Sequence, residues 1–356
     1  MARKLKIKVR TTVAGLESGF VPHEGREGKL RLDYNENTVG CSPAVRRALA
    51  RMTAEQIAMY PEYGAATKRL ARHFGVRPAE MVIANGADDS LRVIMDVFLE
   101  RGATVLLVEP GFPMFRFYAA LAGARIVRVR FSEDMKFPLE EVMRALKQKP
   151  RVFFLANPNN PTGTVLGKKE LLRIIESSPE TAVVVDEAYA EFSGVTVLPW
   201  IRRCKNLLVV RTFSKAMGLA GLRLGFVFAH AELAELCRKT QPPFPVNMPA
   251  LVAAEAALGD RVFVRRYVAA VKKSRRMLAR WLEGRGVKVF PSATNFVYAD
   301  FGARATRIVR GLEKRGILVR DRASDFGRPG LVRIALGTEA QTRRLIRAIN
   351  DTGDPR

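Results

Sequence analysis

Residues 211–225, RTFSKAMGLAGLRLG, follow directly on the short apolar run NLLVV at 206–210. The run predicts a buried strand, and the polar and small residues after it predict the loop that leaves this strand. Lys215 is therefore expected in a loop at the carboxyl end of a strand, the edge where open α/β sheets bind ligands. A single loop lysine is more often a solvated residue, so its role depends on what accompanies it.

The neighbours of Lys215 suit an anion. Thr212 and Ser214 offer hydroxyl groups, and Arg223 offers a planar, permanently charged fork that matches phosphate. An amine beside a phosphate seat suggests pyridoxal phosphate, whose aldehyde forms a Schiff base with a lysine. This hypothesis requires a partner for the cofactor's ring nitrogen and further phosphate donors elsewhere in the chain.

Two earlier strands end in residues of the required kind. The run MVIA at 81–84 is followed by a glycine turn and a helix start, which gives the backbone N–H groups of Ala87 and Asp88 a positive helix end. This arrangement suits a phosphate, although a simple helix cap has the same pattern. Phe112 follows the strand expected at 104–108, where its ring could lie against a planar cofactor or pack in the core.

Two later strands place polar groups at their ends. A turn dense in proline and glycine follows the strand at 152–155 and holds Asn160, a fixed amide donor. The apolar run at 181–185 leads to Asp186, a carboxylate that is costly beside such a strand unless a cation, such as a protonated pyridine nitrogen, accompanies it. Tyr189 is three residues further on and could reach the cofactor's phenolic oxygen.

The order of elements predicts the fold class. Strands and helices alternate from about 80 to 230, which indicates an α/β fold with a mainly parallel sheet and helices on both faces. After the linker QPPFPVN at 241–247 the pattern changes to that of a smaller α+β domain. We therefore expect a large domain at 38–245 and a small domain built from 1–37 and 246–356.

The composition is that of an ordinary globular protein, with 356 residues, 48% hydrophobic and 27% charged. The net charge of +25 favours phosphorylated or carboxylate substrates. The basic residues are scattered over helix faces without a nucleic-acid motif, so we expect a solvated basic surface and no specific nucleic-acid site.

Three cysteines without a CxxC motif indicate neither a disulfide framework nor a zinc site, and no metal is expected. No apolar run is long enough to cross a bilayer, and no secretory signal follows the basic start. We expect a cytoplasmic enzyme.

Further motifs accompany the stretch at 211–225. They are DYNEN at 33–37, YPEYG at 60–64, NGADD at 85–89, NNPTG at 159–163, DEAY at 186–189 and two arginine-bearing strands at 316–320 and 331–337. In this order they resemble the fold-type I aminotransferases that use pyridoxal phosphate, and among these most closely the histidinol-phosphate subfamily. The resemblance covers nearly the whole chain.

The resemblance implies a division of roles around the cofactor. Lys215 would form the Schiff base and then act as the base that moves the substrate's proton. Asp186 would keep the pyridine nitrogen protonated, Asn160 and Tyr189 would hold the phenolic oxygen, and Phe112 would stack on the ring.

It also implies phosphate and substrate contacts. A homodimer with shared active sites is implied, because a tyrosine from the second subunit would complete the phosphate seat. Arg333, and with it Arg320, would bind the anionic end of the substrate or of glutamate, and Asn35 of the first motif would also contact the substrate. The phosphate donors would be Ala87, Asp88, Thr212, Ser214, Arg223 and Tyr60 of the second subunit.

The substrate expected from the resemblance is histidinol phosphate, with 2-oxoglutarate as the amino acceptor. The chain departs from the subfamily at Phe20, where members commonly carry a tyrosine that helps to grip the substrate phosphate. The alternatives are an aminotransferase for aromatic or other amino acids, or a decarboxylase of the same fold that acts on a phosphorylated substrate.

Overall fold

The computed structural model describes residues 7–16 and 24–352. Its largest element is a seven-stranded sheet in the order β2-β8-β7-β6-β5-β3-β4. Only β8 runs antiparallel to its neighbours, so the predicted mainly parallel sheet is confirmed. The strands are β2 (Met81–Ala84), β3 (Thr104–Glu109), β4 (Arg125–Arg130), β5 (Val152–Ala156), β6 (Ala182–Asp186), β7 (Leu207–Thr212) and β8 (Gly225–Ala229).

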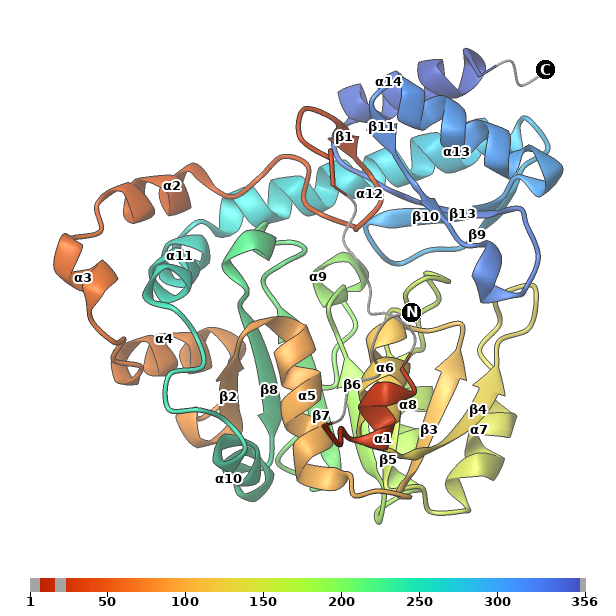
Figure 1. The fold of residues 1–356 in the computed structure, drawn as a ribbon. Helices are drawn as coiled ribbons and strands as arrows, with labels where there is room; N and C mark the ends of the chain where they lie inside the picture. The colour runs from red at the N-terminus through yellow and green to blue at the C-terminus, as the bar shows by residue number, and fades with distance from the viewer. Residues whose placement is uncertain (1–6, 17–23, 353–356) are drawn as a thin grey trace.

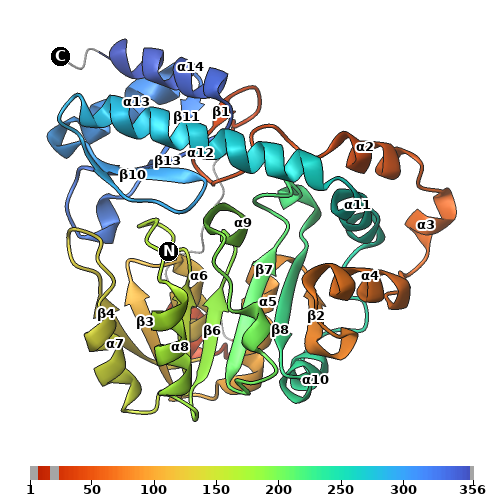
Figure 2. The same ribbon diagram turned by 180° about the vertical axis from the view of Figure 1, so that it is seen from behind.

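Both faces of this sheet are buried, which explains its continuous apolar runs. Along β6, Val183 and Val185 pack into one core while Val184 packs into the core on the opposite face. Helices cover both sides, as predicted (Figures 1 and 2). Helices α5 (Gly86–Phe98) and α6 (Pro113–Leu121) lie on one face, and α7 (Leu139–Leu146) and α8 (Lys168–Glu176) lie on the other.

The sheet brings several strand ends to one edge. Strands β3, β5, β6 and β7 are parallel, and β2 has the same direction because β8 is antiparallel to both β2 and β7. The loops that follow these strands therefore meet at a single edge. One boundary differs from the prediction: the strand expected to end at 210 continues to Thr212, because β8 pairs with Arg211 and Thr212.

A smaller sheet lies above this edge (Figure 1). Its order is β12-β13-β10-β9, and the N-terminal strand β1 (Leu30–Arg31) pairs with β11 (Ile317–Leu318) beside it. The N-terminal segment thus joins the C-terminal part, while the predicted domain boundaries remain a prediction. The strands are β9 (Lys288–Phe290), β10 (Phe296–Asp300), β12 (Arg320–Asp321) and β13 (Leu331–Ala335).

The long helix α12 (Arg261–Glu283) crosses from the large sheet to the small one (Figure 2). Helix α2 (Pro43–Ala50) begins as predicted, with Ser42 as its cap and Pro43 in its first turn. No helix in the described ranges is long and apolar enough to span a membrane. The remaining helices are α1 (Thr11–Ala14), α3 (Ala54–Ala58), α4 (Gly64–Phe74), α9 (Ala190–Ser193), α10 (Ala231–Lys239), α11 (Met248–Gly259), α13 (Ala305–Lys314) and α14 (Glu339–Asn350).

Candidate active site

A cavity of about 420 Å³ lies where the loops of the large sheet face the small sheet. Its size is typical of small-molecule sites. Residues from nearly the whole length of the chain line it, and most of the predicted site residues are among them. Those are Asn35, Ala87, Asp88, Phe112, Asn160, Asp186, Tyr189, Thr212, Ser214, Lys215, Arg223, Arg320 and Arg333.

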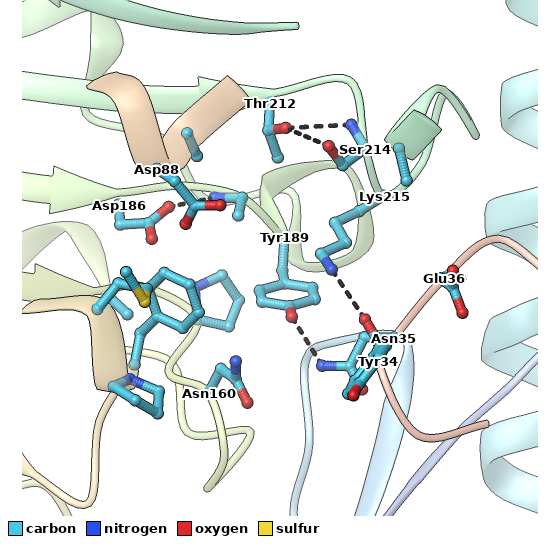
Figure 3. Close-up of a pocket in the computed structure, with 18 of the residues that line it drawn as sticks. Tyr34, Asn35, Glu36, Asp88, Asn160, Asp186, Tyr189, Thr212, Ser214 and Lys215 are labelled. Carbon is cyan, nitrogen blue, oxygen red and sulfur yellow. Dashed lines mark hydrogen bonds between the residues drawn. The ribbon is translucent and has the colours of Figure 1, made fainter. Parts of the chain in front are cut away.

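Lys215 extends into this cavity from the loop after β7 (Figure 3). Its Nζ donates a hydrogen bond to the backbone oxygen of Tyr34 at 3.0 Å and lies 6.0 Å from the centre of the Tyr189 ring. Removal from water lowers the pKa of the amine to about 8, and the nearby charge of Arg333 acts in the same direction. Near neutral pH an appreciable fraction of the amine is therefore uncharged and nucleophilic.

Asp186 is the last residue of β6, and its side chain is buried at the cavity wall. Its Oδ1 accepts a hydrogen bond from the backbone N–H of Ala188 at 3.0 Å. Burial raises the pKa of the carboxyl group to about 7. Among the described residues no cationic side chain forms an ion pair with it, so the site provides a carboxylate that a cationic ligand group would stabilise.

Tyr189 and Asn35 form a buried pair in the middle of the site (Figure 3). The Nδ2 of Asn35 donates to the Tyr189 hydroxyl at 2.8 Å, and burial raises the pKa of this hydroxyl to about 12. The backbone of Asn35 has a φ of 56°, a left-handed conformation that asparagine adopts more readily than most residues with a side chain. The geometry of the site thus depends on the segment around Asn35.

Arg333 links the small sheet to the large one. Its Nη1 donates to Oδ1 of Asn160 at 2.5 Å, and its Nη2 donates to the backbone oxygen of Asp33 at 2.5 Å. Burial lowers the pKa of Arg333 to about 10, so it remains a cation at neutral pH. Because Asn160 accepts this bond through its oxygen, its amide N–H groups remain for a ligand.

An anion-binding site, called the anion seat below, is formed where α5 begins. Ala87 and Asp88 lie in the first turn of α5, where backbone N–H groups have no partner inside the helix. Arg223 lies beside them with its Nη2 3.1 Å from Oδ2 of Asp88. A Cβ atom on Gly86 would lie 2.5 Å from that nitrogen, so a side chain at residue 86 would displace the guanidinium from this place.

The hydroxyls of the seat come from the end of β7. The Oγ1 of Thr212 and the Oγ of Ser214 lie 3.0 Å apart, and the backbone N–H of Ser214 donates to Thr212 (Figure 3). Both side chains are buried and line the cavity. Phe112 also lines it and packs edge-on against Phe115 at 5.7 Å between ring centres.

Among the described residues, one predicted site residue does not line the cavity of this single chain. Tyr60 is 75% exposed and stacks on Phe244 at 4.1 Å between ring centres. Phe20 lies outside the described residues.

Sequence reasoning missed other residues of the cavity wall, above all Tyr34, Glu36 and Arg322. Tyr34 and Glu36 flank Asn35 within a motif that was already noted. Arg322 follows Arg320 by two residues, so the alternation of side chains along a strand could have indicated that both arginines face the same way.

The family of aminotransferases of class I and II matches residues 27–349. The chain belongs to this family. The aminotransferase match agrees with a site that combines a buried amine, a buried carboxyl group and an anion seat.

Individual aminotransferases show the same similarity over most of their length. Histidinol-phosphate aminotransferase of Geobacillus sp. (strain WCH70) is 35% identical over 327 residues, which are 90% of this chain and 89% of the relative. The structure of histidinol-phosphate aminotransferase from Sinorhizobium meliloti, in complex with pyridoxal-5'-phosphate, has a TM-score of 0.88 at 28% identity and covers 97% of each chain. The structure of L-threonine-O-3-phosphate decarboxylase from Porphyromonas gingivalis has a TM-score of 0.77 at 25% identity, covering 92% of this chain and 100% of that protein.

Pyridoxal phosphate is the cofactor of this family, and the residues present fit it. Asp186 is a buried carboxyl group without a cationic side-chain partner in the described part of the chain, as a pyridinium nitrogen requires. The start of α5, the two hydroxyls and Arg223 offer the donors that a phosphate requires. Of the described lysines, Lys215 alone lines the cavity.

Proposed function

We propose that this aminotransferase exchanges an amino group between glutamate and imidazole-acetol phosphate, so that it acts on histidinol phosphate and 2-oxoglutarate in histidine biosynthesis. The observation that carries the proposal is the arrangement of Lys215, Asp186 and four arginines around one cavity. The relatives at about a third identity that bear this activity in their names support the same substrate.

The chain's own residues would divide the work of cofactor binding. We assign the phosphate to Ala87, Asp88, Thr212, Ser214 and Arg223. Asp88 contributes through its backbone, because its carboxylate already pairs with Arg223.

The ring of the cofactor would have separate contacts. Asp186 would lie at the ring nitrogen, Asn160 and Tyr189 at the phenolic oxygen, and Phe112 against the ring face. When bound, the cofactor supplies an aldehyde that bonds to amines and a ring that withdraws electrons from the substrate's α-carbon.

Lys215 would perform the proton transfer. An amine with a pKa of about 8 is a suitable general base near neutral pH, since a useful fraction is uncharged while its conjugate acid can still return the proton. The hydrogen bond to the Tyr34 backbone oxygen holds Nζ inside the cavity before substrate binds. Lys215 Nζ would take the proton from the α-carbon of the substrate.

The substrate's anionic end would bind to Arg333 and Arg320. These residues face each other across the pairing of β12 with β13, and both line the cavity. Asn35 would complete this side of the site through its contact with Tyr189. Phe20 remains a predicted substrate contact, at which the missing tyrosine hydroxyl would affect the choice of substrate.

A second copy of the chain would complete the site. The exposed side chains of Ile57, Met59 and Tyr60 form an apolar stretch beside Phe244, a surface that favours a protein partner. We infer a homodimer in which Tyr60 contacts the phosphate held by the other subunit.

A cytoplasmic location is part of the proposal, in keeping with the free thiols of Cys41, Cys204 and Cys237.

A substrate panel tests the proposal. The purified holoenzyme is expected to transfer the amino group of histidinol phosphate to 2-oxoglutarate with a kcat/KM at least tenfold above that for phenylalanine. A preference for phenylalanine would contradict it. Release of carbon dioxide from a phosphorylated amino acid would favour the decarboxylase reaction of the Porphyromonas gingivalis neighbour instead.

A further inference from the structure

A third arginine faces the cavity beside the two that were expected. Residues 320 and 321 form β12, in which Arg320 lies opposite Arg333 of β13. The backbone N–H of Arg322 continues the pairing by donating to Leu331 O at 2.8 Å. Arg322 follows the last residue of β12 and lines the same cavity as the other two arginines.

The guanidinium of Arg322 is held in one orientation. Its Nε donates to Oδ2 of Asp325 at 2.8 Å, and its Nη2 donates to Oδ1 of the same carboxylate. The hydroxyl of Tyr298 also donates to Asp325 Oδ2, at 2.8 Å. Arg322 is only 9% exposed, and such a bidentate contact in a buried setting fixes the plane of the fork. Asp325 and Tyr298 therefore hold the guanidinium of Arg322 in a fixed orientation.

One edge of the fork remains for a ligand. Within the described ranges of the chain, no acceptor hydrogen-bonds to Nη1 of Arg322, because the contacts to Asp325 use Nε and Nη2. Arg333, by contrast, already donates from both terminal nitrogens to Asn160 and Asp33. Each terminal nitrogen carries two N–H groups, so Arg333 keeps one on each for a ligand, whereas both N–H groups of Arg322 Nη1 have no partner among the described residues.

Three guanidinium groups line this end of the cavity, those of Arg320, Arg322 and Arg333. Asp325 pairs with Arg322, and the carboxylate of Glu36, which pairs with Arg26, also lines the cavity. A carboxylate offers two oxygen atoms to such donors, whereas a phosphate monoester offers three and carries about 1.5 to 2 negative charges at neutral pH. The number of converging donors therefore suits a phosphate.

We propose that Arg322, held in place by Asp325 and through it by Tyr298, is a specificity residue. It contacts the phosphate of phosphorylated substrates and favours them over dicarboxylates. This inference rests on the proposed function, because it assigns the phosphate of that substrate to the side of the cavity formed by Arg320, Arg322 and Arg333. It adds a contact that neither Arg333 nor Arg320 supplies.

The test compares ligands of the two kinds. Binding of glycerol 3-phosphate and of succinate to the holoenzyme is measured by calorimetry, and KM is measured for histidinol phosphate and for glutamate. The variants are Arg322→Gln, Arg322→Lys and the double change Arg322→Gln with Asp325→Asn, which avoids an unpaired buried carboxylate. Arg328→Gln is the matched control, because Arg328 lies on the same loop and pairs with Asp300 at 2.9 Å but does not line the cavity.

We expect Arg322→Gln and the double variant to weaken glycerol 3-phosphate binding tenfold or more and to raise the KM for histidinol phosphate by a similar factor. Succinate binding and the KM for glutamate should change less than threefold. Arg322→Lys should recover part of the loss, and Arg328→Gln should match the wild type.

Two results would overturn the inference: phosphate binding within twofold of wild type in the double variant, or equal losses for phosphate and succinate. The experiment distinguishes failure of this inference from failure of the proposed function. If the proposed function is wrong, the wild-type enzyme does not turn over histidinol phosphate, but the binding of glycerol 3-phosphate still tests the role of Arg322.

Discussion

Arg333 Nη1 lies 2.5 Å from Oδ1 of Asn160, so a strand of the small sheet is tied directly to the loop that follows β5 of the large sheet. The same asparagine retains its amide N–H groups for the cofactor. Asn160 would therefore serve two ligands at once, the substrate through Arg333 and the cofactor through its own donors.

Substitution of Asn160 can separate these two roles. Asn160→Ala should lower kcat by about 10²-fold, the usual effect of removing a donor to developing charge, and should also raise the KM for glutamate. Asn160→Asp keeps the acceptor for Arg333 but has no N–H donor, so it should lower kcat while leaving this KM nearly unchanged. Steady-state kinetics of both variants provide the measurement, and an Asn160→Asp enzyme with normal kcat would rule out the donor role.

The reactivity of Lys215 should depend on pH in a defined way. Its pKa is lowered from 10.5 to about 8, so in cofactor-free protein its acylation should accelerate as the pH rises through about 8. Arg333→Gln removes a positive charge that lowers this pKa, so the midpoint should move upward yet stay below 10.5, because burial persists. Peptide mass spectrometry can follow the reaction, with the exposed Lys205 as the reference. A midpoint that is unchanged in the variant would contradict the assigned electrostatic coupling.

Glu80 should contribute to acid sensitivity. Its buried carboxylate accepts hydrogen bonds from Arg77 and Arg202 at 2.7 to 3.0 Å, and these arginines lower its pKa from 4.5 to about 2. A lowered folded-state pKa stabilises the fold above about pH 4.5, and that contribution is lost as the pH falls towards 2.

Glu80→Gln should therefore reduce the free energy of unfolding by about 2 kcal/mol at pH 7 and by much less at pH 3. Urea denaturation at the two pH values measures this difference. Glu140→Gln is the control, since the pair of Glu140 with Arg173 is exposed, and it should leave stability unchanged. An equal loss of stability from Glu80→Gln at both pH values would refute the linkage.

The shared site can be tested by mixing two inactive enzymes. If Tyr60 of one subunit serves Lys215 of the other, a dimer of Tyr60→Ala with Lys215→Ala contains one site with both substitutions and one site with neither. Refolding the two variants together should restore about a quarter of wild-type activity for random pairing of equal amounts. The absence of any recovery in dimers shown to be mixed would exclude this arrangement.

The sequence was sufficient to predict the parts of the site that follow strand ends. Asp186 ends an apolar run, Asn160 and Lys215 lie in the loops that follow two others, and the pairing of parallel strands brings such ends together. The end of the strand before Lys215 was misplaced by two residues. Arg211 and Thr212 have polar side chains, yet backbone pairing with β8 keeps them in the strand.

Contacts between distant segments were beyond prediction from local pattern. Lys215 bonds to the backbone of Tyr34, 181 positions away, and a backbone oxygen carries no signal in the sequence. The orientation of the Arg322 side chain likewise depends on Asp325 and on Tyr298, which comes from another strand. Such pairs are created by tertiary packing, which periodicity and turn chemistry do not describe.

The central claim is that Lys215 is the amine that bonds to the cofactor. The most direct measurement is borohydride reduction of the protein incubated with pyridoxal phosphate, followed by peptide mass spectrometry of wild type, Lys215→Ala and the surface control Lys205→Ala. We expect the reduced cofactor on the peptide containing Lys215 in wild type and in the control, and its loss in Lys215→Ala. Stoichiometric labelling of a different lysine in the wild-type protein would contradict the account.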